Sequence, residues 1–305
     1  MGTPEFALPS LKAILESEHK LLAVVTQPDR PKGRGKKLAP SPVKEFSLEN
    51  ELEVFTPENL KSDEFVLKLT DLNPDLLAVV AFRILPEKVF TIPPRGTINL
   101  HASLLPRYRG AAPINWAIIN NEKKTGVTTF FIRKKVDTGD IILQKEAEIY
   151  PEETYGELSQ RLSIIGSELL LETIDLIEKG EVKPLPQNNE EATKAPKITP
   201  ELCRIDWSKS ALEIQNLIRG LSPAPGAYTF YKGKILKLFK AQAVDETTYS
   251  QGFGEVISAE KNKGIEIKTS KGSLRIQELQ PESKKKMKGD EFLRGYAIKK
   301  GDKLG

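Results

Sequence analysis

The sequence predicts an α/β fold in two domains, a parallel-sheet domain first and a small β domain after it. Apolar strand-like runs alternate with amphipathic helical segments in the first half, which is typical of a parallel sheet covered by helices. A polar stretch with four prolines follows at 181–203 and is typical of a linker. Because 305 residues can form two cores, we expect one domain over 1–180 and another over 204–305.

The elements of the first domain follow from hydrophobic periodicity. We expect strands at 21–26, 75–82 and 96–102, with helices at 5–17 and 62–72 between them. Two β-rich runs at 126–132 and 141–149 flank a turn. A long helix is expected at 153–179, because apolar residues recur there at helical spacing, and core packing explains that stripe.

The second domain is predicted to be mainly β. A short helix is expected at 211–219, and strands at 227–231, 235–243, 254–258, 264–269 and 273–279. Five short strands separated by glycine or polar turns suit a small barrel of the OB type. Such barrels often bind nucleic acid.

The strand at 96–102 brings an amide and an imidazole to one face. Residues two apart in a strand project to the same side, so Asn99 and His101 point together, while Ile98 and Leu100 point the other way. The pair suits a reaction that develops negative charge on a carbonyl oxygen. Asn can donate to that oxygen, and His can donate when protonated or act as a base when neutral.

Such an imidazole needs a third group to orient it. Asp137, in the turn between the two β-rich runs, offers a carboxylate that can fix the ring and stabilise its protonated form. The alternative is that His101 is a hydrogen-bonded core histidine and Asp137 an ordinary turn residue. The pattern alone leaves both interpretations open.

Several sequence blocks together resemble the methionyl-tRNA formyltransferase family. They run in order along nearly the whole chain: GTPEFA at 2–7, TQPDRPKGRGKKL at 26–38, PSPVK at 40–44, SLLPRYRGAAP at 103–113, DTGD at 137–140 and IDW at 205–207. The Ser-Leu-Leu-Pro block is shared by folate-dependent formyltransferases in general. The blocks at 26–38 are narrower and favour the tRNA enzyme.

The resemblance implies a Rossmann-like formyltransferase domain with a C-terminal OB-like tRNA-binding domain, acting as a monomer. Its activity is formyl transfer from 10-formyltetrahydrofolate, a co-substrate, to the α-amino group of methionyl-initiator tRNA, without a metal. Asn99, His101 and Asp137 match the catalytic residues, and Phe6 matches a residue that contacts the methionine side chain. The implied folate-binding residues are Phe82, Leu85, Ser103, Leu104, Leu105, Pro106, Arg107, Tyr108, Arg109 and Gly110.

The chain departs from the family pattern at its start. The family has a short apolar strand before the Gly-Thr-Pro at 2–4, and this chain begins at Met1. We expect that inner strand to be missing, the natural protein to be longer, and the neighbouring strand edges to be exposed.

Composition limits the class of protein. Cys203 is the single cysteine, which rules out an internal disulfide and fits a reducing compartment, so we expect a cytoplasmic protein of bacterial type. Two histidines and one cysteine argue against a zinc site. The sequence has no membrane-length apolar run and no signal peptide, so no membrane partner is expected.

Positive charge is concentrated in two places. Residues 201–305 hold 20 Lys and Arg against 13 Asp and Glu, whereas the rest holds 26 against 29, so a polyanionic partner or ordinary solubilising charge would explain the difference. The 30–44 segment is basic and rich in proline and glycine, and it is either a tRNA-gripping loop or a loop without a role. The implied tRNA contacts are Arg30, Lys32, Arg34, Lys36 and Lys37. A second basic run at 284–288 stays open between tRNA contact and solvated charge.

Two other functions remain possible at this point. A sugar-nucleotide formyltransferase would share the catalytic residues and a similar second domain, but it would have little use for the basic 30–44 segment. A tRNA-binding protein with an impaired catalytic site is the other alternative, because of the missing first strand.

Overall fold

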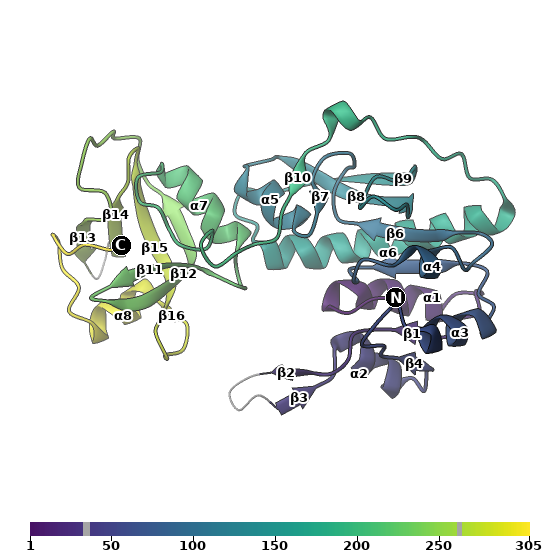
Figure 1. Ribbon diagram of the computed structural model, residues 1–305. Helices are drawn as coiled ribbons and strands as arrows, with labels where there is room; N and C mark the ends of the chain where they lie inside the picture. Colours follow the sequence, from purple (N-terminus) through teal and green to yellow (C-terminus); the bar gives the residue numbers. More distant parts are fainter. Residues whose placement is uncertain (33–36, 261–263) are drawn as a thin grey trace. The chain divides into compact units, whose positions relative to one another are not determined.

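The computed structural model describes residues 1–32, 37–260 and 264–305, and the chain forms two compact units (Figure 1). The first unit comprises Met1–Pro113, Lys124–Glu148 and Ser159–Ala195; the second comprises Ile114–Lys123, Ile149–Leu158 and Pro196–Gly305. The last crossing between the units, after Ala195, lies inside the predicted linker.

Two segments of the predicted first domain belong to the second unit because of long-range contacts. The Asn115 side chain donates to the Gly220 carbonyl oxygen at 2.7 Å. The Gly156 N–H donates to the Ser222 carbonyl oxygen at 3.0 Å. These bonds join residues 114–123 and 149–158 to the chain that follows the linker.

A four-stranded sheet in the order β5-β6-β8-β9 is the centre of the first unit. Its strands are β5 (Leu77–Val80), β6 (Thr97–His101), β8 (Lys124–Phe131) and β9 (Ile141–Glu148). β5 and β6 are parallel, as predicted, but β8 runs antiparallel to both of its neighbours, so the sheet is mixed. The turn between β8 and β9 is too short for the crossover that parallel strands require.

Shorter strands and helices surround this sheet. Two small strand pairs are parallel: β1 (Val24–Val25) with β4 (Val54–Phe55), and β7 (Arg109–Gly110) with β10 (Lys194–Ala195). A third pair, β2 (Arg30–Lys32) with β3 (Lys37–Ala39), is antiparallel. The helices are η1 (Glu5–Ala7), α1 (Leu8–Leu15), α2 (Pro42–Glu49), α3 (Asp63–Asp71), α4 (Glu87–Phe90) and η2 (Asn189–Glu191).

The long helix α6 (Tyr155–Lys179) covers one face of the sheet. Of its predicted apolar stripe, Leu162 is fully buried and Leu169 is 4% exposed. The Thr173 hydroxyl bonds the Thr129 hydroxyl of β8 at 2.7 Å, which fixes the helix to this face. Packing of one apolar helix face on a sheet is what the periodicity predicted.

Met1 and Gly2 lie between β1 and β5. The Met1 nitrogen donates to the Ala78 carbonyl oxygen at 2.7 Å, and the Gly2 N–H donates to the Val25 carbonyl oxygen at 3.0 Å. Next to them is a cavity of about 520 Å³, lined by residues 20–25, by residues 72–78 and by α6. β1 is shorter than predicted, and residues 21–23, which were expected to belong to it, line this cavity.

The second unit is built on an antiparallel sheet in the order β11-β12-β15-β14-β13, with β16 paired to β15. The strands are β11 (Ala227–Tyr231), β12 (Lys234–Ala243), β13 (Val256–Glu260), β14 (Gly264–Lys268), β15 (Ser273–Pro281) and β16 (Met287–Lys288). Three helices complete this unit: α5 (Pro113–Ile119), α7 (Ala211–Gly220) and α8 (Gly289–Gly295). The part of α5 that belongs to the second unit starts at Ile114. The five predicted strands are all present.

The predicted OB-type barrel would need a closed sheet, and the named strands leave β11 and β13 as edges. Single bridges join Leu304 to Tyr231 of β11 and Lys303 to Glu255, just before β13. The final residues of the chain therefore contact both edges, although they form no strand among the described residues.

Across the described ranges, no helix combines the length and the apolar character needed to cross a membrane.

Candidate active site

Strand β6 presents Asn99 and His101 on the face away from α6. Leu100 is paired across the sheet with Thr129, whose hydroxyl contacts α6, so Leu100 faces that helix. Strand alternation then places Asn99 and His101 on the opposite face. Asn99 is half-buried, and within the described ranges its side chain makes no hydrogen bond, so its amide is available to a ligand.

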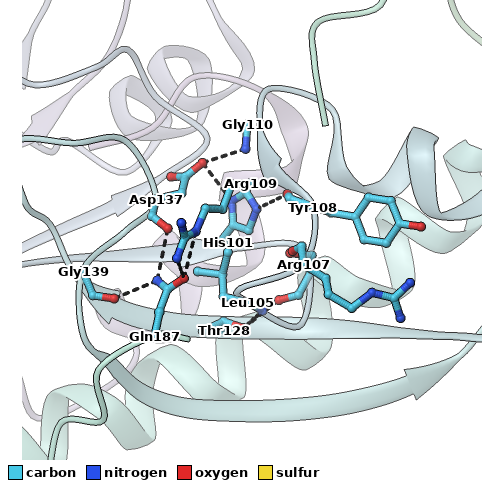
Figure 2. A network of polar contacts seen from close by, with 11 residues as sticks. His101, Leu105, Arg107, Tyr108, Arg109, Gly110, Thr128, Asp137, Gly139 and Gln187 are labelled. Carbon is cyan, nitrogen blue, oxygen red and sulfur yellow. Dashed lines mark hydrogen bonds and ion pairs between the residues drawn. The ribbon is translucent and has the colours of Figure 1, made fainter. Parts of the chain in front are cut away.

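The orientation of the His101 ring is fixed by a backbone carbonyl. Nε2 lies 2.9 Å from the Tyr108 carbonyl oxygen, which can only accept, so Nε2 carries the hydrogen (Figure 2). Nδ1 is the nitrogen left to gain or lose a proton. The His101 side chain is 7% exposed and packs edge-on against Phe130.

The fold brings Asp137 close to His101, a proximity that the sequence pattern alone left open. Its Oδ2 atom lies 3.9 Å from His101 Nδ1, which is within ion-pair range and too long for a hydrogen bond. The same oxygen accepts from the Gly110 N–H at 2.8 Å. Asp137 adopts a positive φ of 53° in the turn between β8 and β9, and its side chain is 11% exposed.

The turn that follows β6 is held by two side chains from β8 and β9. The Thr128 hydroxyl donates to the Ser103 carbonyl oxygen and accepts from the Leu105 N–H. The Gln144 amide donates to the Leu105 carbonyl oxygen and to Thr128. Within the turn, the Ser103 hydroxyl donates to the Arg107 carbonyl oxygen at 2.7 Å. The main chain of the predicted folate-binding block is thereby fixed beside His101.

Part of the predicted linker forms one side of this site. The Tyr108 N–H donates to the Thr193 hydroxyl at 2.8 Å, and β7 pairs with β10. Gly110 is required here, because at its φ of 126° a Cβ would lie 2.6 Å from the Ala195 carbonyl oxygen. No local sequence pattern predicts this arrangement, since its contacts join residues about 85 positions apart.

Gln187 is a second feature that the sequence did not reveal. Its amide donates to the carbonyl oxygens of Asp137 and Gly139, and its oxygen accepts from the Arg109 guanidinium (Figure 2). Burial lowers the pKa of Arg109 from its ordinary value, and the nearby charge of Asp137 opposes that shift. A glutamine in a polar, proline-containing stretch carries no distinguishing signal.

Two family profiles match this chain. The profile described as formyl transferase matches residues 1–174, and that described as formyl transferase, C-terminal domain, matches residues 197–297. The chain belongs to the formyl transferase family.

Among curated members of the formyl transferase family, methionyl-tRNA formyltransferases are highly similar over nearly their whole length. The Alkaliphilus oremlandii protein is 47% identical over 306 residues, which cover 100% of this chain and 98% of the relative. The Clostridium novyi protein is 48% identical over 300 residues, which cover 98% and 96%.

Solved structures share the fold at lower identity. The sugar 3N-formyl transferase WlaRD, solved with dTDP and 5-N-formyl-THF, aligns with a TM-score of 0.67 at 23% identity over 93% of this chain and 97% of that one. HypX from Aquifex aeolicus, solved with tetrahydrofolic acid, gives 0.60 at 23% identity. That alignment covers 81% of this chain and 43% of HypX, so the chain spans less than half of that protein.

The residues expected to bind folate after β5 pack on the same apolar core and differ in their exposure. Leu85 is 6% exposed and packs in the apolar core, whereas Phe82 is half-buried with the Arg83 guanidinium 5.2 Å from its ring. Arg83 itself donates to the carbonyl oxygens of Pro57 and Glu58. Phe6 lies on η1 and is half-buried.

The basic 30–44 segment contributes the two short strands β2 and β3 and the start of α2, and residues 33–36 of the predicted loop lie outside the described residues. β2 and β3 pair antiparallel and extend away from the layered part of the first unit (Figure 1). Asp29 and Lys44 form an ion pair at 2.8 Å. Arg30 and Lys37 are on the described strands, and Arg34 and Lys36 lie outside the described residues.

Proposed function

We propose that this chain transfers the formyl group of 10-formyltetrahydrofolate to the α-amino group of methionyl-initiator tRNA. The observation that carries the proposal is the approach of Asp137 to His101 on the face that also presents Asn99. Its support includes relatives of 45–48% identity that bear the name methionyl-tRNA formyltransferase.

The proposed chemistry is direct attack of the amine on the formyl carbon. As the N–C bond forms, the carbonyl oxygen becomes an oxyanion, and the Asn99 amide and protonated His101 donate to it. Because Nε2 is already donated to the Tyr108 carbonyl, Nδ1–H is the donor that His101 offers. The amine then loses a proton, and the bond between the formyl carbon and the folate nitrogen breaks.

Asp137 has two tasks in this scheme. Its negative charge, 3.9 Å from Nδ1, stabilises the imidazolium. One carboxylate oxygen is held by the Gly110 N–H, and the carboxylate can help to move the proton from the attacking amine to the leaving folate nitrogen.

Substrate binding is assigned to the surfaces around these residues. The fixed turn at 103–110 and Phe82 form the folate wall, and Phe6 contacts the methionine side chain. The basic 30–44 segment, which includes the paired strands β2 and β3, grips the tRNA acceptor end through phosphates. The second unit, which we propose to be OB-like, supplies a further tRNA surface.

An acceptor assay tests the reaction. The protein is incubated with 10-formyltetrahydrofolate and either charged initiator tRNA or an amino-sugar nucleotide. Formylation of the tRNA alone is expected. Formylation of the sugar alone would make it a sugar-nucleotide formyltransferase, and tRNA binding without transfer would make it a catalytically impaired tRNA-binding protein.

Replacement of His101 tests the mechanism. We expect His101→Ala to lower kcat by on the order of a hundred- to a thousand-fold, the usual effect of removing one oxyanion donor, with little change in tRNA binding. The matched control is His19→Ala, since His19 is the other histidine and is paired with Asp175 at 2.7 Å. Near-normal turnover of His101→Ala would remove His101 from the mechanism.

A further inference from the structure

A closed ring of contacts surrounds Asp137, and one side chain closes it. Gln187 Nε2 donates to the Asp137 carbonyl oxygen at 3.1 Å, and Asp137 Oδ2 accepts from the Gly110 N–H at 2.8 Å. Arg109, bonded covalently to Gly110, donates through Nε and Nη2 to Gln187 Oε1 at 3.0 and 2.6 Å. Figure 2 shows these contacts together beside His101.

Local contacts hold part of the turn that carries Asp137: the Thr138 hydroxyl donates to the Lys135 carbonyl oxygen at 2.8 Å, and Arg133 pairs with Asp140 at 2.6 Å. The segment between β8 and β9 has no regular structure, and Asp137 has a left-handed backbone conformation. Gln187 also donates to the Gly139 carbonyl oxygen at 2.7 Å, so it holds the main chain at two points around the carboxylate. The Gly110 bond then sets the direction of the carboxylate itself.

Only a primary amide meets both requirements at this position. Two carbonyl oxygens need donors on one side, and a guanidinium needs an acceptor on the other. Glutamate would keep the acceptor and lose both donors, lysine would keep donors and lose the acceptor, and methionine would lose both.

We propose that Gln187 is a positioning residue for formyl transfer, and that its amide holds the Asp137 turn against Arg109 so that the carboxylate faces His101. The inference rests on the proposed function, in which Asp137 supports His101. Gln187 acts through Asp137 although it lies on the segment predicted to be a linker, so that segment supplies one positioning residue to the site.

A double-mutant cycle tests this coupling. Gln187→Met, Asp137→Asn and the double variant are compared with Asn188→Ala, an exposed neighbour whose side chain bonds only within its own segment. We expect Gln187→Met to lower kcat about ten- to a hundred-fold with a much smaller change in either KM, because misplacement of a catalytic group by about 1 Å has effects of that size. In the Asp137→Asn background the same change should have less than a three-fold effect.

Histidine NMR supplies a readout that a general loss of stability would not produce. The chain has only His19 and His101, so the ring signals of His101 can be followed with His19 as an internal reference. In Gln187→Met the His101 signals should shift toward those of Asp137→Asn, while His19 stays unchanged. Asn188→Ala should move neither.

Each outcome decides between the two proposals. Equal losses from Gln187→Met with and without Asp137 would overturn the role of Gln187, and so would wild-type kcat in Gln187→Met. Wild-type kcat in Asp137→Asn would instead overturn the proposed role of Asp137 in catalysis, and no formyl transfer by the wild-type protein would overturn the proposed function. If Gln187→Met fails to fold, Gln187→Glu keeps the Arg109 bonds and tests the two donors alone; full activity there would also refute the inference.

Discussion

At the residue scale, the site depends on close approaches of main chain that only particular residues allow. Gly110 has a φ of 126° and lies against the Ala195 carbonyl oxygen, and its N–H holds the Asp137 carboxylate. A side chain at this position would separate β7 from β10. It would also move the Gly110 N–H, from which the Asp137 carboxylate accepts a hydrogen bond. The small size of one residue therefore controls the position of a proposed catalytic group.

Gly110→Ala should destabilise the protein more than an equivalent change elsewhere. The control is Gly180→Ala, since Gly180 also has a positive φ, 71°, but no atom lies within 4 Å of the position of its Cβ. Both variants carry backbone strain, and only Gly110→Ala adds a steric clash, for which we expect a further loss of about 1–3 kcal/mol in the free energy of unfolding. Denaturant titration measures the difference, and equal losses would show that the contact with Ala195 relaxes freely.

Local sequence patterns predict some of these residues and carry no signal for others. Asn99 and His101 were placed on one face by strand alternation, which needs only local periodicity. The approach of Asp137 to His101 was a hypothesis that the fold had to test, because the turn could point in several directions. Gln187 and Thr193 act through backbone atoms 48 to 85 residues away in sequence, and no local pattern records such contacts.

At the element scale, helix α7 is defined at its start by a capping box. The Ser210 hydroxyl accepts from the Glu213 N–H and donates to the Glu213 carboxylate, which also accepts from the Ser210 N–H at 2.9 Å. The hydrogen bonds from Ser210 lower the pKa of Glu213 from its ordinary value. A lowered carboxyl pKa means that the ionised form stabilises the folded state.

Ser210→Ala should therefore have a pH-dependent effect. Near pH 7 we expect it to lower the free energy of unfolding by about 1 kcal/mol, as loss of a serine N-cap usually does. The part that depends on ionised Glu213 is fully present above the ordinary carboxyl pKa of about 4.3 and disappears as the pH falls through the lowered value of the folded state. Urea titrations of both proteins at pH 7 and pH 3 measure this, and a difference that stayed constant or grew in acid would contradict the capping argument.

The two sheets differ in how well local sequence predicted them. The strands of the second unit were placed within about two residues, because glycine and polar turns separate antiparallel neighbours clearly. In the first unit β1 spans Val24–Val25 where six residues were expected, and residues 21–23 line a cavity and form no strand. Strand pairing is a long-range property, and periodicity gives only the candidates for it.

At the scale of the whole molecule, the chain passes between its two units several times. The segments 114–123 and 149–158 belong to the second unit by their contacts, although they lie inside the predicted first domain. Buried Arg219 shows why, since it donates to the Glu153 carbonyl oxygen at 3.2 Å and to Asn216 at 2.9 Å. Composition carries no record of such long-range bonds, so the predicted boundaries rest on the polar, proline-containing stretch alone.

The counts of basic and acidic residues in the second unit do not show which of its lysines are paired with carboxylates. Several lysines of the second unit are paired with carboxylates, for example Lys240 with Glu152 and Lys271 with Glu246. In the basic run at 284–288, Lys286 pairs with Glu278. Lys284 and Lys285 are exposed, and within the described ranges no carboxylate pairs with either of them. Lys288 is also exposed and its ammonium has no carboxylate partner in those ranges, so these three are the cations of that run available to a polyanion.

Salt dependence of tRNA binding distinguishes contact from solvated charge at Lys284 and Lys285. Each phosphate neutralised by a lysine contributes about −0.7 to −0.9 to the slope of log K against log salt concentration. If both lysines contact the tRNA, Lys284→Gln with Lys285→Gln should flatten that slope by about 1 to 2. The control, Lys240→Gln with Lys271→Gln, changes net charge equally but removes cations that already have partners, so its slope should stay close to that of the wild type. Binding of charged initiator tRNA measured over a series of salt concentrations gives both values. Identical slopes for the two double variants would assign Lys284 and Lys285 to solvation and leave tRNA binding to other surfaces, the basic 30–44 segment among them.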